Sequence, residues 1–340
     1  MERVRRKFPT LLPTKKRGRP TGEEKQRKRM HMEYFANEIL KLKSTLDFPV
    51  SARGWCYILE GKGIITKGEF SDAEKLINDC RKSGLLPIDI CAEDAKRSTS
   101  NILYQTLSDI EMYLGDEREK IFNYLINTFQ PILPHDFQSC YIEMGVEKID
   151  LVGLFSPVCQ HYGVPITNLG GWGDLNSRTA ILRRFAEYDD RRMVLLYCGD
   201  FDPGGLIISD TLRKNFTDME TAAKCRGLTE RIEIVKFGLD YDFIEENGLT
   251  WIENLETSSG NDLGDPNHPD HNKPYVQDYI ARYGVRKCEA NALVVNVGVG
   301  RELCQSTILH YVDPDEHDKY LRTITEQRSR LSEYLNGKMF

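Results

Sequence analysis

The sequence lacks the long apolar segments of a membrane protein. No apolar run approaches the length that spans a bilayer, and the first residues contain no secretory apolar core. The nine cysteines are an odd, scattered set without a Cys-x-x-Cys pair, which argues against a disulfide framework or a zinc knuckle. Such cysteines are typical of small core residues in a reducing compartment. We therefore expect a cytoplasmic protein with no membrane partner.

Acidic residues are scarce at the beginning of the chain. The first 30 residues contain twelve Lys or Arg and only three Glu, whereas the whole chain of 340 residues has a net charge of −6. With 40% hydrophobic and 29% charged residues, the chain has the composition of a soluble protein and the length for two domains. A basic arm on an acidic body indicates contact with a polyanion such as DNA; the alternative is a disordered, solubilising tail.

Residues 16–20 of this arm read Lys-Arg-Gly-Arg-Pro. The segment resembles the core of an AT-hook, an extended stretch that lies in the narrow minor groove of A·T-rich DNA. The resemblance implies that Lys16, Arg17, Gly18 and Arg19 bind double-stranded DNA, because glycine lets the backbone sit deep while the guanidinium groups reach the negative potential there.

The strongest chemical signal is in residues 193–205, which read MVLLYCGDFDPGG. The apolar run predicts a strand buried in a parallel sheet, and Asp200 and Asp202 follow at its carboxyl end, on the same side if the strand geometry persists. A turn and an amphipathic helix from residue 206 come next. Two carboxylates so close favour a cation between them and indicate half of a Mg²⁺ site. The alternative is a solvated turn with a helix cap.

A second strand followed by an acid lies upstream. Residues 141–150 read YIEMGVEKID, in which a short strand ends in Glu147 and runs into a helix; a further strand begins near residue 163, before a glycine-rich turn at residues 170–173. This order, closed by the Asp-x-Asp motif, resembles the TOPRIM domain over residues 139–305, a Rossmann-like unit of topoisomerases, primases and some nucleases. The resemblance implies that Glu147, Asp200 and Asp202 hold Mg²⁺.

The region before this domain predicts three helices, at residues 23–44, 53–60 and 67–83, and a short strand with its wing at residues 85–90. Three helices and a β wing outline a winged helix-turn-helix. This fold usually places its third helix on DNA, and it also mediates protein contacts.

Within the second of these helices, residues 53–57 read Arg-Gly-Trp-Cys-Tyr. They are similar to the Arg-x-x-aromatic-Tyr stretch of the topoisomerase VI A subunit and the related meiotic double-strand-break transesterase. The resemblance implies that Tyr57 is a nucleophile assisted by Arg53, in a homodimer that pairs the tyrosine of one protomer with the Mg²⁺ of the other. This chain departs from the family at Gly54 and Cys56. The alternative is that Tyr57 is a packing residue.

Between the two domains, residues 98–134 predict a helix pair broken near Gly115, and residues 231–239 predict another strand. Glu289 precedes an apolar run and is either peripheral to the metal site or a charge at a helix N-terminus. The expected organisation is a basic arm (1–30), a winged helix domain (31–97), a helical linker (98–136), a TOPRIM domain (137–310) and a C-terminal helix (311–340).

Together these features predict an α/β protein, with a winged helix-turn-helix domain followed by a Rossmann-like TOPRIM domain whose sheet is mainly parallel. We expect a nucleoid-associated, Mg²⁺-dependent transesterase resembling the type IIB topoisomerase A subunit, which cleaves DNA through a 5′-phosphotyrosyl link at Tyr57. Strand passage would require a separate ATPase subunit. The alternatives are a TOPRIM nuclease that uses metal-activated water, and a catalytically silent DNA-binding or regulatory protein.

Overall fold

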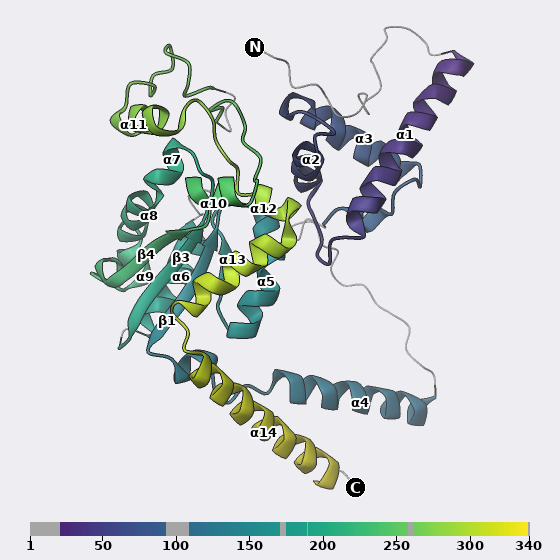
Figure 1. Cartoon of the computed structure of the whole chain (residues 1–340). Coiled ribbons are helices and arrows are strands. Elements are labelled where there is room, and N and C mark those ends of the chain that lie inside the picture. Colours follow the sequence, from purple (N-terminus) through teal and green to yellow (C-terminus); the bar gives the residue numbers. More distant parts are fainter. Residues whose placement is uncertain (1–20, 93–108, 171–174, 189, 258–260, 339–340) are drawn as a thin grey trace.

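The centre of the molecule is a four-stranded parallel sheet (Figure 1). The computed structural model describes residues 21–92, 109–170, 175–188, 190–257 and 261–338. The sheet has the order β2-β1-β3-β4 and comprises β1 (Cys140–Val146), β2 (Ile166–Asn168), β3 (Arg192–Cys198) and β4 (Ile232–Phe237). The expected α/β class and parallel sheet are confirmed. Because β1 and β3 are neighbours at the point where the strand order reverses, the loops after them meet in a crevice at the carboxyl edge.

Helices cover both faces of the sheet. Alternate residues of β1 and β3 enter two separate cores, because successive side chains of a strand point to opposite faces. One core contains residues of α5 (Ile149–Tyr162) and α13 (Val297–Leu309), and the other contains residues of α6 (Leu175–Ala186) and α8 (Ile208–Thr217). Shorter helices complete this domain: α7 (Pro203–Leu206), α9 (Glu220–Ala223), α10 (Tyr241–Glu246), α11 (Pro274–Tyr283) and α12 (Ala292–Val295).

The N-terminal part of the described chain is a helical unit made of α1 (Gly22–Lys43), α2 (Ala52–Gly61) and α3 (Phe70–Lys82), which confirms the three expected helices. The strand expected at residues 85–90 is wrong, because Ile88–Ile90 forms a 3₁₀ turn. Its carbonyl groups are bound by side chains rather than by a neighbouring strand: Trp55 Nε1 donates to the Ile90 oxygen over 2.8 Å. Within residues 21–92 the only β pairing is an isolated bridge between Val50 and Cys91.

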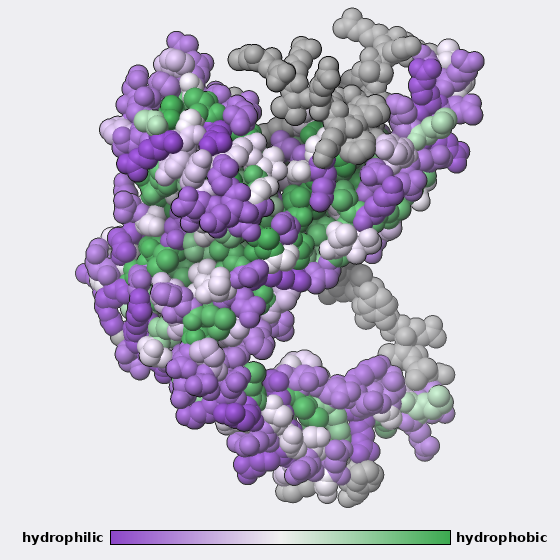
Figure 2. Space-filling model, viewed as in Figure 1, coloured by the Kyte–Doolittle hydropathy of each residue, from purple (hydrophilic) through white to green (hydrophobic). Residues whose placement is uncertain are grey.

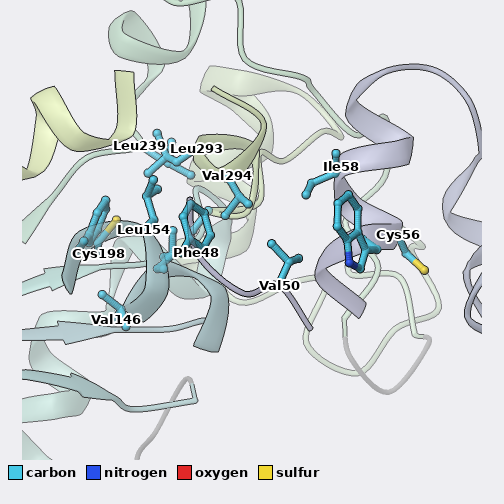
Figure 3. Packing of buried hydrophobic residues seen from close by; sticks show 14 of the residues in the cluster. Phe48, Val50, Cys56, Ile58, Val146, Leu154, Cys198, Leu239, Leu293 and Val294 are labelled. Atoms are coloured by element: carbon cyan, nitrogen blue, oxygen red, sulfur yellow. The ribbon is translucent and has the colours of Figure 1, made fainter. Parts of the chain in front are cut away.

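The helical unit is docked on the sheet domain through the beginning of α2. Ser51 caps α2 by accepting a hydrogen bond from the Gly54 amide over 2.9 Å. The Ser51 amide and hydroxyl also donate to the two carboxylate oxygens of Asp150 in α5, over 3.0 and 3.2 Å. A Cβ atom on Gly54 would lie 2.5 Å from Asp150 Oδ2, so the glycine permits this close approach. Figure 3 shows Phe48 and Val50 between α2 and the sheet domain.

The connection between the two parts contains α4 (Ile110–Thr128), which lies beside the C-terminal helix α14 (Pro314–Lys338). These two helices project away from the rest of the molecule (Figure 1). The break expected near Gly115 is wrong: the helix continues through this residue, supported by an Asp109 cap and by the Lys120–Asp116 ion pair at 2.6 Å. The other helix of the expected pair falls outside the described residues. No helix in the described ranges is long and apolar enough to cross a membrane.

Candidate active site

The carboxyl ends of β1 and β3 bring Glu147 and Asp200 together, as their positions after two neighbouring parallel strands predict. The Glu147 amide donates to the Cys198 oxygen over 2.9 Å, which extends the pairing of the two strands beyond their ends. The Asp200 amide in turn donates to Glu147 Oε2 over 2.9 Å. The two acids are therefore held in a fixed relation by backbone hydrogen bonds.

Asp202 lies in the same acidic cluster but has different partners. Its carboxylate caps α7 and accepts the Gly205 amide hydrogen over 2.6 Å. A Cβ atom at Gly205 would lie 2.2 Å from the Asp200 backbone oxygen, so only glycine allows this tight turn. Phe201, between the two aspartates, exchanges both backbone hydrogen bonds with Cys288. After burial, the charge of Asp200 is the main cause that raises the pKa of Asp202, so the two carboxylates lie within electrostatic reach.

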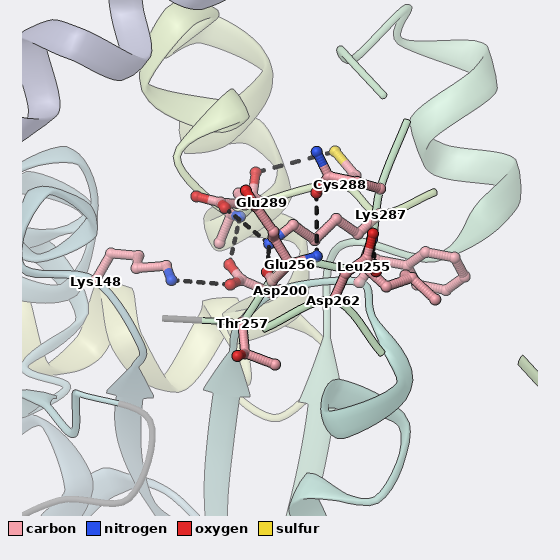
Figure 4. Close-up of polar contacts among 12 residues, drawn as sticks. Lys148, Asp200, Leu255, Glu256, Thr257, Asp262, Lys287, Cys288 and Glu289 are labelled. Carbon is pink, nitrogen blue, oxygen red and sulfur yellow. Dashed lines mark hydrogen bonds and ion pairs between the residues drawn. The ribbon is translucent and has the colours of Figure 1, made fainter. Parts of the chain in front are cut away.

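A lysine that the sequence analysis missed neutralises this cluster. Lys148 Nζ lies 2.8 Å from Asp200 Oδ2 (Figure 4). It also lies 3.2 Å from Glu147 Oε1. The other oxygen of Asp200, Oδ1, accepts the Ala290 amide hydrogen over 2.8 Å. The only signal in the sequence is that a basic residue directly follows Glu147, and charged residues after a strand are too common to be informative.

Burial controls the ionisation of these groups. Burial, followed by the charges of Glu147 and Glu289, raises the pKa of Asp200 to about 6, while Lys148 opposes the increase. Burial acts to lower the pKa of Lys148. The negative charges of Asp200 and Glu147 outweigh this effect of burial and raise the pKa of Lys148 above its usual range. Lys148 therefore stays charged at neutral pH, whereas Asp200 titrates in mildly acidic solution.

Two further lysines lie around the cluster. Lys287 forms an ion pair with Glu289 at 3.2 Å and also donates to the Glu256 backbone oxygen. Lys236 on β4 donates to the Asp200 backbone oxygen over 3.1 Å, and burial lowers its pKa. With Lys148, these residues balance a group of buried or half-buried carboxylates that would otherwise repel one another.

Tyr57 and Arg53 approach the same edge of the sheet from α2, which packs against α12. Tyr57 and Glu289 line the same hollow, and the charges of Glu289 and Arg53 both act on the Tyr57 hydroxyl. The Arg53 guanidinium itself donates to Glu74 Oε1 over 3.4 Å. Burial, and then the charge of Glu289, raises the pKa of Tyr57 above its usual value. Its ring packs edge-on against Phe70, with centroids 5.0 Å apart. Of the two alternatives for Glu289, a position peripheral to the metal site or a charge at a helix N-terminus, the structure favours the first, because its charge acts on Asp200.

A small hollow lies beside this tyrosine, with a volume of about 20 Å³. That volume accommodates about one water molecule. The lining residues are Tyr57, Glu60, Gly61, Thr250, Ile252, Glu289, Ala292 and Val295.

The donor chemistry of the cluster suits a hard cation such as Mg²⁺, since Glu147, Asp200 and Asp202 supply only carboxylate oxygens and Asp200 repels each of the other two. Among the described residues, however, no three acidic, imidazole or thiol side chains are already arranged to hold a metal ion. The Lys148 ammonium provides the positive charge between two of these carboxylates.

The predicted DNA-binding residues Lys16, Arg17, Gly18 and Arg19 lie outside the described residues, as do residues 171–173 of the glycine-rich turn. Comparisons of this chain with models of known families, with curated proteins and with solved structures found no match.

Proposed function

We propose that this chain is a DNA-binding, Mg²⁺-dependent DNA-cleaving transesterase similar to the type IIB topoisomerase A subunit, with Tyr57 as its nucleophile. The observation that supports this most strongly is the position of Tyr57. Although it belongs to the N-terminal helical unit, Tyr57 lines a hollow together with Glu289 of the same chain, at the edge of the sheet that carries Glu147 and Asp200. The resemblance implies a pairing across a homodimer, whereas this chain brings its own tyrosine to that edge. Packing alone would need a ring at this position but not a hydroxyl within electrostatic reach of a carboxylate and a guanidinium.

The chemistry requires that Tyr57 lose its proton, and its raised pKa makes a base necessary. Glu289, which lines the same hollow as Tyr57, would accept that proton, and Arg53 would stabilise the tyrosinate. A bond forms between Tyr57 Oη and the phosphorus while the bond from phosphorus to the 3′-oxygen breaks, and that oxygen takes up a proton. One phosphodiester replaces another, so the step is reversible and leaves a 5′-phosphotyrosyl link.

Glu147, Asp200 and Asp202 would hold Mg²⁺, which would supply positive charge for the phosphate oxygens and the leaving oxygen. Because the Lys148 ammonium already contacts Glu147 and Asp200, it must give up at least one of these contacts when the ion binds. The three helices of the N-terminal unit and the basic arm would bind the duplex, and a separate ATPase subunit would be needed for strand passage.

Access to Tyr57 requires a movement. The hollow beside the hydroxyl, about 20 Å³, is far smaller than a phosphodiester with its sugars. We therefore expect α2 to shift relative to α12 when DNA binds. The Ser51–Asp150 hydrogen bonds at the beginning of α2 would then act as the fixed end of that motion.

The small size of the hollow beside Tyr57 favours a second candidate, a TOPRIM-type nuclease that hydrolyses DNA with metal-activated water. In this case Glu147, Asp200 and Asp202 would hold the Mg²⁺ that activates the water, and Tyr57 would only pack beside Glu289, with which it lines the hollow. Cleavage would leave protein-free ends.

The two candidates are separated by incubating supercoiled plasmid with the full chain and Mg²⁺, stopping with detergent, and running the DNA with and without protease. The transesterase predicts breaks that appear after denaturation with protein attached, loss of all cutting in Tyr57→Phe, and normal cutting in the control Tyr34→Phe, an exposed tyrosine of α1. Asp200→Ala should abolish cutting and retain DNA binding. Free ends together with full activity of Tyr57→Phe would reject the transesterase in favour of the nuclease.

A further inference from the structure

Helix α4 carries an exposed apolar stripe that the described part of the chain leaves open except at its C-terminal end, where Leu125 and Leu331 of α14 line the same hollow. None of its residues is buried, and Ile110, Leu114, Ile121 and Leu125 are 73%, 59%, 52% and 40% exposed. At 3.6 residues per turn these four side chains fall within an arc of roughly 60° on one side of the helix. We call them the α4 stripe. Figure 2 shows apolar side chains among hydrophilic ones on the projecting part of the molecule that α4 and α14 form.

The positions of the α4 stripe are symmetric along the helix. Ile110 and Leu125 are equally far from a midpoint between Glu117 and Arg118, and so are Leu114 and Ile121. A helix with such a pattern is complementary to a copy of itself turned end for end, as a two-fold axis through the midpoint requires.

We propose that the α4 stripe is a dimerisation surface whose occupant is α4 of a second copy of this chain, packed antiparallel. In that pairing Leu114 lies opposite Ile121 of the second copy and Ile110 lies opposite Leu125, so four apolar layers form. Glu117 lies opposite Arg118 of the second copy on both sides of the axis. This charge complementarity favours a second copy over an unrelated apolar partner.

The neighbouring helix α14 leaves the stripe accessible. Its Arg328 donates to the backbone oxygens of Asn127 and Phe129 at 3.0 and 3.2 Å and to Gln130 Oε1 at 3.0 Å, at the C-terminal end of α4 and just after it. At this end a hollow of about 400 Å³ includes Leu125. Antiparallel pairing would place Ile110 of the second copy at this hollow. The lining residues are Leu125, Thr128, Phe129, Gln130, Pro131 and Leu331.

The inference does not depend on the chemistry at Tyr57. Two helices of 19 residues, each about 28 Å long, make a contact at the small end of specific interfaces. We therefore expect a dimer that dissociates on dilution, with a Kd on the order of micromolar.

Sedimentation velocity of the full chain over a range of concentrations tests the proposal. We expect dimers for the wild-type chain and monomers for Leu114→Glu and for Ile121→Glu, because symmetry places each new carboxylate in the interface twice. Each of the two substitutions should raise the Kd of the dimer at least about 30-fold. Met112→Glu is the matched control: Met112 is an apolar residue of α4 that is 66% exposed and lies on the opposite side, so this variant should dimerise normally.

Charge exchange tests the antiparallel register. Glu117→Arg and Arg118→Glu should each weaken the dimer, because like charges then face each other, and the double exchange should restore it. Since no substituted side chain is buried, unchanged circular dichroism and thermal melting would show that the variants are folded. A wild-type chain that stays monomeric at every concentration, or a Leu114→Glu chain that dimerises like the wild type, would overturn the proposal; failure of the double exchange to restore the dimer would overturn its register.

Discussion

The Lys148 ammonium lies 2.8 Å from Asp200 Oδ2, and thus the chain itself supplies a cation to the acidic cluster at the carboxyl edge of its sheet. The Lys148 and Asp200 side chains are 25% and 8% exposed, so water screens the pair only weakly. Glu147 shares the same ammonium at 3.2 Å. The ion pair makes the cluster stable without a metal ion, and it must rearrange when one binds.

Lys148→Met should destabilise the protein, because it leaves Asp200 and Glu147 without their nearest positive charge. Removing one partner of a buried ion pair costs about 3 kcal/mol in the free energy of unfolding. If the cluster binds Mg²⁺, adding MgCl₂ should recover much of this loss, since the ion replaces the missing charge. Urea unfolding with EDTA and with MgCl₂ measures both effects. The exposed Lys82→Met at the end of α3 is the control and should match the wild type; equal stability of Lys148→Met in EDTA would contradict the prediction.

The stability of the metal-free protein should depend on the ionisation of Asp200. Its folded-state pKa is raised to about 6 from 3.8, so folding favours the protonated carboxyl. The stabilisation from that proton is fully present below pH 3.8 and is lost as pH rises through about 6. Asp200→Asn carries no such group. Its unfolding free energy should therefore increase relative to the wild type between pH 4 and 7, by up to about 3 kcal/mol. Urea titrations at several pH values, with Asp242→Asn of α10 as the control, measure this; a constant difference across the range would refute the assignment.

Gly54→Ala should destabilise the protein even though alanine is the better helix former. The added Cβ would lie 2.5 Å from Asp150 Oδ2 and 2.6 Å from Val50 Cγ1, which forces α2 away from α5 at a cost of about 2 kcal/mol. Gly115→Ala in α4 is the matched control, because nothing lies within 4 Å of its added Cβ, and it should stabilise the protein by roughly 1 kcal/mol. Thermal unfolding of both variants gives the comparison. If both substitutions stabilised the protein, α2 and α5 would be able to move apart at Gly54 without cost, and the prediction would be wrong.

The sheet and the Glu147–Asp200 contact could be predicted from the sequence because they depend on local patterns. β1 and β3 are short apolar runs, each followed by an acid, and parallel neighbours bring such ends together. The strand predicted at residues 85–90 failed because carbonyl groups there are bound by side chains from α2 and α3, Trp55 and Arg81, which the local pattern does not contain.

The rest of the site depends on how the two parts of the chain dock. Tyr57 reaches Glu289 only because Ser51 and Asp150 fix the beginning of α2 on α5, and no periodicity in either segment reports that contact. The role of Lys148 was missed for a similar reason: its partner Asp200 comes from a different strand, so the ion pair exists only after the sheet has formed.

The most direct test of the proposed chemistry is the covalent state of Tyr57 after reaction. The full chain would be incubated with a DNA duplex and Mg²⁺, denatured, and digested with nuclease and trypsin before mass spectrometry of the peptide that spans residues 54–62. If the chain is a transesterase, this peptide should carry a nucleotide esterified to Tyr57. The same peptide from the Asp200→Ala variant should be unmodified. DNA that is cut while the peptide stays unmodified would contradict Tyr57 as the nucleophile.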